Sequence, residues 1–302
     1  MKTKIIIFAL FLTSFISIAQ QDAQYTQYMY NTINVNPAYA GSRDVLSVFA
    51  MHRTQWVGLD GAPVTNVFSI NAPISNSRLG VGLSFINDRL GPTTENAVSA
   101  DVSYTVPTSE NFKLSFGVKG TANFFNLDVT KLLARNPLDV SYQNVQNFSP
   151  NVGAGIYFHS NKTYIGASVP NILQTIRYSD NSVSVNKERM NLYLIGGHVF
   201  DLSSEIKLKP AFLIKAIQGA PLQADLSANF MFSGKFVLGA AYRWSAAASL
   251  MAGFQANESL YIGYGYDLET TRLRNYNAGS HEIFLRYEFF KSDAKIVSPR
   301  FF

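Results

Sequence analysis

Apolar and polar residues alternate with a period of two along most of the chain after residue 45. In residues 98–106 the even positions carry Val, Ala, Val, Tyr and Val, whereas the odd positions carry Ser, Asp, Ser and Thr. In residues 282–289 the odd positions are apolar and the even positions are charged, with Phe284 as the exception. Because successive residues of a strand point to opposite faces, each such segment is expected to form a strand with one apolar and one polar face.

About fourteen segments of this kind follow one another, and their mean length suits the ~9–11 residues that a strand needs to cross a bilayer. They span residues 45–57, 64–72, 78–87, 94–106, 112–126, 150–159, 163–170, 188–201, 206–218, 221–232, 235–244, 247–256, 259–268 and 279–290. The pattern predicts an all-β fold, a transmembrane antiparallel up-and-down β-barrel of about 14 strands over residues 45–290. An even number of strands leaves both ends of the barrel on one side, which we expect to be periplasmic.

A large soluble β-sandwich or barrel is the alternative fold for so many strands. Its outward face would be polar, and one core could not bury so many apolar faces. Charged residues make up 15% of the chain, whereas soluble proteins carry roughly a quarter. The long connections, residues 128–149, 171–187 and 269–278, also alternate with short polar turns, as in outer-membrane barrels. These observations favour a barrel that faces lipid.

The two ends of the chain differ from the strand region. Residues 1–19 combine the basic Lys2 and Lys4, an apolar stretch and the small-residue site Ser17-Ile18-Ala19, which predicts a signal peptide cleaved after Ala19. An uncleaved anchor helix is the alternative. Residues 20–44 are rich in Tyr and Asn, and we expect an irregular periplasmic N-terminal segment that tucks into the barrel mouth or docks on a partner. Residues 291–302 are expected to form a C-terminal periplasmic tail.

Candidate chemistry is sparse, and we expect no catalytic, metal-binding or cofactor-binding residues. The chain has no cysteine, its four histidines fall on four different predicted strands, and no G-x-S-x-G elbow is present. The G-x-G pairs lie inside strands, where glycines leave space within a barrel rather than bind a nucleotide. The formal charge of +5 falls to +3 without Lys2 and Lys4, so no nucleic-acid partner is expected. Charges of both signs on the predicted inner face indicate internal ion pairs, with a charge-selective pore as the alternative.

Four motifs in order along the chain resemble those of one family. The first, residues 24–41, includes Tyr28, Asn31, Asn36, Pro37, Tyr39 and Gly41. The second, residues 52–58, includes Arg53, Gln55 and Trp56, and the third, residues 88–92, includes Asp88 and Arg89. With residues 281–289, these motifs resemble the PorP/SprF membrane proteins of the type IX secretion and gliding apparatus of Bacteroidetes-type bacteria. The chain departs from the family's usual opening at Thr32, where a proline is commonly seen, and this affects only the local turn.

The resemblance implies a non-enzymatic outer-membrane barrel that binds and anchors the C-terminal domain of a secreted adhesin and assists its export. The implied partners are that secreted type IX substrate, other type IX components in the periplasm, and outer-membrane lipid. A passive porin or small-solute transporter is the alternative function. As a hypothesis, Arg53, Gln55, Trp56, Asp88 and Arg89 shape the mouth of the barrel for a partner. The alternative is that they only set the conformation of the rim.

Overall fold

The computed structural model describes residues 25–131, 144–173, 190–218 and 220–290. The predicted signal peptide, residues 20–24 and the predicted tail lie outside the described residues. Over the described ranges, no helix has both the length and the apolar character that crossing a membrane requires.

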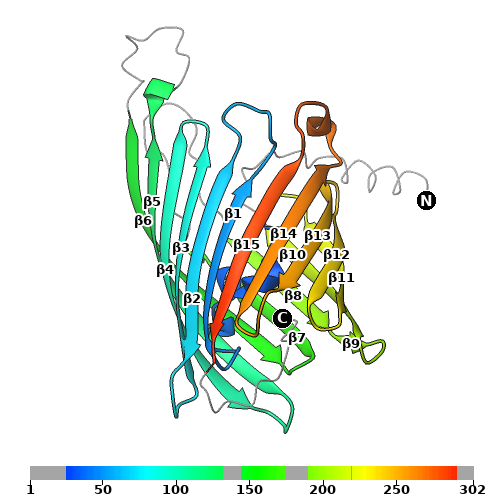
Figure 1. Cartoon of the computed structure of the whole chain (residues 1–302). Helices are drawn as coiled ribbons and strands as arrows, with labels where there is room; N and C mark the ends of the chain where they lie inside the picture. Colours follow the sequence, from blue (N-terminus) through cyan, green and yellow to red (C-terminus); the bar gives the residue numbers. More distant parts are fainter. Residues whose placement is uncertain (1–24, 132–143, 174–189, 219, 291–302) are drawn as a thin grey trace, which may run out of the picture.

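The described strands form one closed antiparallel barrel (Figure 1). Neighbours in sequence pair throughout, and the ring closes where β1 pairs with β15, with Leu46 opposite Phe289. The strands are β1 (Leu46–Thr54), β2 (Val64–Pro73), β3 (Leu79–Leu90), β4 (Thr93–Pro107), β5 (Lys113–Leu127), β6 (Val145–His159), β7 (Thr163–Val169), β8 (Asn191–His198), β9 (Phe200–Asp201), β10 (Ile206–Ile217), β11 (Gln223–Phe232), β12 (Phe236–Arg243), β13 (Ala247–Gln255), β14 (Leu260–Glu269) and β15 (Ser280–Phe289).

The labels β8 and β9 mark two parts of one strand. Both pair with β10 in a single register, since Ala211 lies opposite Gly197 and Leu208 lies opposite Phe200. That register places Pro210 opposite His198, at the point where the strand assignment is interrupted. Proline has no backbone N–H and cannot complete the ladder there. The barrel therefore has 14 strands, as the sequence predicted.

The two faces of the strands also follow the predicted alternation. Outward residues such as Leu83, Val118 and Leu250 are exposed to the surroundings of the barrel, which is the arrangement of a barrel embedded in lipid. The charged residues predicted for the inner face are buried, except Lys113 and Lys207, which lie near a rim with partly exposed side chains. Phe284, the exception in the pattern, faces inward and is 1% exposed.

The two rims of the barrel differ. The short-turn rim carries residues 74–78, 108–112, 160–162, 202–205, 233–235 and 256–259. The long-loop rim carries residues 55–63 and 270–279, together with the described ends of two further connections, residues 128–131 and 144 and residues 170–173 and 190. The wall is highest at β3–β6, at the left of Figure 1, and β4, β5 and β6 have 15 residues each. β12 has 8 residues. β6 begins at Val145, earlier than predicted, and only its residues 154–159 pair with β7. The long-loop rim is therefore raised on one side.

Residues 25–44, which we call the luminal segment, lie inside the barrel (Figure 1). The segment forms three short 3-10 turns, η1 (Tyr28–Tyr30), η2 (Thr32–Asn34) and η3 (Pro37–Tyr39). The last turn begins where the Asn36 side chain accepts a hydrogen bond from the Ala38 N–H, and Pro37 supplies the next residue, a favourable helix start. Nearly every residue from Thr26 to Ala40 is buried. The tyrosines of the segment therefore form the core of the barrel.

Inward glycines make room for this segment. A Cβ at Gly80 would overlap the carbonyl of Ala40, and one at Gly117 would overlap the backbone nitrogen of Ala38. A Cβ at Gly155 would overlap the side chain of Asn36. These positions allow the close backbone approach for which glycine is required. Of the glycines predicted to leave space inside the barrel, those at positions 80, 82, 155 and 265 face the luminal segment, whereas those at positions 153 and 263 face Pro170 and Phe284.

Gly117→Ala should destabilise the protein, because the added methyl group meets backbone that cannot rotate away. Overpacking of this kind costs about 1–3 kcal/mol. Gly120→Ala, on the same strand, is the matched control, since a Cβ there meets nothing within 4 Å. Thermal unfolding in detergent should show a lower midpoint for Gly117→Ala alone. Equal midpoints for the two variants would contradict the close packing of η3 against β5.

Candidate functional site

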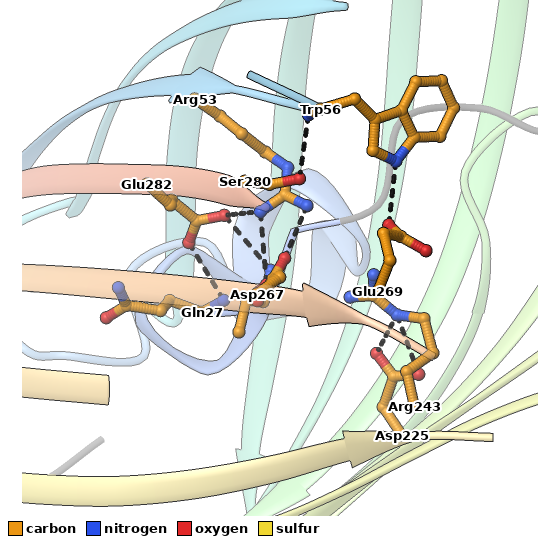
Figure 2. Close-up of polar contacts among 10 residues, drawn as sticks. Gln27, Arg53, Trp56, Asp225, Arg243, Asp267, Glu269, Ser280 and Glu282 are labelled. Atoms are coloured by element: carbon orange, nitrogen blue, oxygen red, sulfur yellow. Dashed lines mark hydrogen bonds and ion pairs between the residues drawn. The ribbon is translucent and has the colours of Figure 1, made fainter. Parts of the chain in front are cut away.

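A cluster of buried charges joins three strands near the long-loop rim (Figure 2). Arg53 on β1 contacts Asp267 on β14 at 2.6 Å and Glu282 on β15 at 3.0 Å. The Arg53 side chain is 2% exposed, and the two carboxylates are equally buried. The register brings the three together, because Arg53 lies opposite Glu282, and Glu282 lies opposite Gly265, two residues before Asp267. One guanidinium therefore faces two carboxylates.

The luminal segment supplies further hydrogen-bond donors to this cluster. The backbone N–H groups of Thr26 and Gln27 donate to the Glu282 carboxylate at 3.2 and 3.0 Å. The Thr26 hydroxyl donates to Asp267 at 2.7 Å and accepts a hydrogen bond from Arg53 at 3.2 Å. Buried charges are stable only when such donors complete their coordination. We call Arg53, Asp267, Glu282, Thr26 and Gln27 the latch.

Two other residues, Arg243 and Trp56, make polar contacts near the latch at the same rim (Figure 2). Arg243 on β12 donates from Nε to both oxygens of Asp225 on β11. The indole Nε1 of Trp56 donates to Glu269 at 2.8 Å, and its backbone N–H donates to Ser280 Oγ. Trp56 has a positive φ of 46°, a conformation that a non-glycine residue keeps only where its surroundings fix it. The two hydrogen bonds of Trp56 thus hold the loop after β1 against β14 and β15.

The other end of the luminal segment is fixed near the short-turn rim. Arg43 forms a buried ion pair with Glu288 on β15, and Asp44 pairs with Lys113 on β5 at 3.1 Å. The Ser103 hydroxyl donates to the carbonyl of Ala40 at 2.7 Å. From Asp44 the chain continues directly into β1. The segment therefore runs through the lumen from one rim to the other, and among the described residues its Asp44 end is the one that continues into a strand.

Tyr30 lies inside the lumen and contacts side chains of β10, β14 and β15. Its ring lies 4.9 Å from that of Phe284 on β15 and 5.2 Å from that of Tyr261 on β14. The ammonium of Lys209 on β10 lies 4.7 Å from the Tyr30 ring centre, and the Arg286 guanidinium lies 5.5 Å from it. Aromatic contacts and cation–π contacts of this kind are individually modest but add to the buried area. Tyr30 is thus the point at which the segment closes the lumen.

The fit between the segment and the wall leaves some polar groups without protein partners. Among the described residues, Gln27 Nε2, Asn31 Nδ2 and both polar side-chain atoms of Asn34 are buried and have no hydrogen-bond partner. Buried polar atoms in a permanently packed core are nearly always paired. The described residues hold no group of three side chains suited to a metal ion.

The residues singled out in the sequence fall into two groups. Most are buried in or against the luminal segment: Tyr28, Asn31, Asn36, Pro37, Tyr39, Gly41 and Arg53. Gln55 and Trp56 are half-buried in the loop after β1, Asp88 is half-buried and accepts a hydrogen bond from Thr65, and Arg89 is exposed on the outward face of β3. The pairing of Arg53 with Asp267 and Glu282 did not follow from the sequence. The one local hint in the sequence, the apolar Phe284 at an inward position, indicates only an apolar partner inside the barrel.

Arg53→Met should destabilise the protein strongly, because Asp267 and Glu282 would lose their guanidinium while remaining buried. Removing one partner of a buried ion pair costs about 3–5 kcal/mol. Arg89→Met is the matched control, since an exposed arginine changes stability by only about 0.5 kcal/mol. Urea unfolding in detergent measures both. A stability loss for Arg53→Met as small as the control's would show that Arg53 does not hold the two carboxylates.

Comparisons with known proteins agree with this architecture. Among solved structures, the toluene transporter TbuX of Ralstonia pickettii superposes with a TM-score of 0.53 at 10% identity, covering 85% of this chain and 93% of that one. The toluene transporter TodX of Pseudomonas putida gives 0.49 at 11% identity, covering 85% and 93%. At 10% identity the likeness to TbuX concerns the barrel fold alone. No curated protein matches the sequence. The model of the type IX secretion system membrane proteins PorP/SprF matches residues 17–287, and the chain belongs to this family.

Proposed function

We propose that this outer-membrane barrel is a non-enzymatic part of the type IX secretion apparatus that binds and anchors a secreted adhesin's C-terminal domain at the cell surface. It also assists export of that adhesin. Family membership supports the secretion role. The observation that carries the proposal is the lumen filled from rim to rim by residues 25–44. A filled barrel with one raised side suits a fixed platform for a protein partner.

The same observation weakens the alternative of a passive porin. A porin needs a continuous water-filled channel, whereas Tyr30, Ile33 and Tyr39 are 4% exposed or less in this lumen. Their contacts reach opposite walls of the barrel. The purified protein should therefore show no steady conductance in planar bilayers.

In this proposal the long-loop rim faces the cell exterior, since outer-membrane barrels carry their longer loops there. The raised wall of β3–β6 and the loop at residues 55–63 then form the partner surface. Burial limits the motif residues that can touch a partner to Gln55, Trp56, Asp88 and Arg89. The short-turn rim then faces the periplasm, where other secretion components are available as partners. The motif residues buried in the lumen then pack the interior of the barrel and do not touch a partner.

Replacing Gln55 and Arg89 together by Ala should lower the amount of adhesin held at the surface at least about tenfold, as loss of two good interface contacts does. The exposed Arg78→Ala at the opposite rim is the matched control and should bind normally. Surface adhesin is measured on whole cells, alongside the amount of folded barrel. Normal capture by the folded double variant would remove these residues from the binding surface.

Purification of the tagged barrel from detergent extract, followed by mass spectrometry, tests the partner itself. The proposal expects a secreted substrate and at least one periplasmic secretion component to copurify. Deletion of the barrel should remove one adhesin from the cell surface. Copurification of neither class of protein would contradict the anchoring role.

A further inference from the structure

We propose that the luminal segment is a releasable plug, and that this barrel conducts small hydrophilic solutes when the latch opens. This activity is separate from adhesin anchoring. Within the part of the chain that the structure describes, the segment continues into a strand at its Asp44 end, near the short-turn rim. At the other rim it is held by non-covalent contacts to Arg53, Asp267 and Glu282. The latch therefore decides whether the lumen is closed.

The latch is built so that the segment completes it. Arg53 offsets one of the two carboxylates, and the N–H groups of Thr26 and Gln27 with the Thr26 hydroxyl serve the remaining lone pairs. Charge-assisted hydrogen bonds are the strong ones in such a low-dielectric site. Departure of residues 26–27 would expose the carboxylates to water or to another donor. A few directed bonds thus hold this end of the segment.

The rest of the interface favours release more than a permanent core would. In the wall, Asn229, Ser69 and Ser103 hydrogen-bond to the segment, among apolar side chains that also pack against it. Gln27, Asn31 and Asn34 each keep a buried polar atom without a partner among the described residues. Such atoms gain hydrogen bonds when water enters. With the segment displaced, the wall of charged and hydroxyl side chains would line a hydrophilic channel.

The test compares two buried threonines of the segment. Thr26→Val removes the hydroxyl that bonds Asp267 and Arg53, whereas Thr32→Val removes one whose bond is to Met29 O within the segment. Single-channel recordings in planar bilayers should show rare openings for the natural protein and roughly tenfold more for Thr26→Val, the effect of losing a hydrogen bond to charged groups. Thr32→Val should behave as the natural protein does. Equal recordings from both variants would overturn the proposal.

A disulfide provides the second measurement. The chain has no cysteine, and a Cβ at Gly265 would lie 3.8 Å from Gln27 Cγ, so Gln27→Cys with Gly265→Cys can tether the segment to β14. In the Thr26→Val background the oxidised protein should be silent and the reduced protein should conduct. If Thr26→Val fails to fold, the tethered pair is recorded alone in mild denaturant, which promotes local opening. Equal conductance of the oxidised and the reduced protein, or no conductance of the reduced protein, would overturn the proposal.

Discussion

A ring of fourteen strands encloses more space than its own side chains fill. Eight-stranded barrels are filled by inward side chains, whereas barrels of 16–18 strands hold an aqueous channel. This barrel lies between those sizes, and residues 25–44 take up the interior. The molecule therefore has two separate apolar environments, the outward band that suits lipid and a tyrosine-rich core around Tyr30. The remaining features of the lumen follow from the need to fit the luminal segment against the inner wall of the barrel.

That fit uses two devices. Inward glycines at positions 80 and 117 let backbone meet backbone, and the one at position 155 makes room for the Asn36 side chain. Charged wall residues receive partners within the wall or from the segment, as Arg53 does from Asp267, Glu282 and Thr26. Burial of those charges is itself caused by the segment, which keeps water from them. Segment and wall charges are therefore interdependent, and a change in either affects the other through the cost of desolvated charge.

The sequence was sufficient to predict the features of the fold that depend on local periodicity. The fourteen strands, their inward and outward faces and the rim with long loops all follow from alternation and turn residues, because lipid imposes a strict preference on one face of each strand. The sequence was insufficient to decide whether residues 25–44 enter the barrel or dock on a partner. Those residues have no period, and their partners on β14 and β15 are more than 200 positions away. Phe284 was the one local hint, since an apolar residue at an inward position needs an apolar partner inside the barrel.

The motifs that link the chain to its family can be interpreted in the same physical terms. Tyr28, Asn36, Pro37 and Tyr39 are buried in the lumen, and Arg53 is fixed beneath the rim. A partner approaching from outside would meet none of these side chains while the segment is in place. The shared motifs therefore specify a filled barrel rather than a particular partner. In the proposed function, contact with an adhesin therefore falls to exposed residues of the long-loop rim, while the packed interior supports that rim.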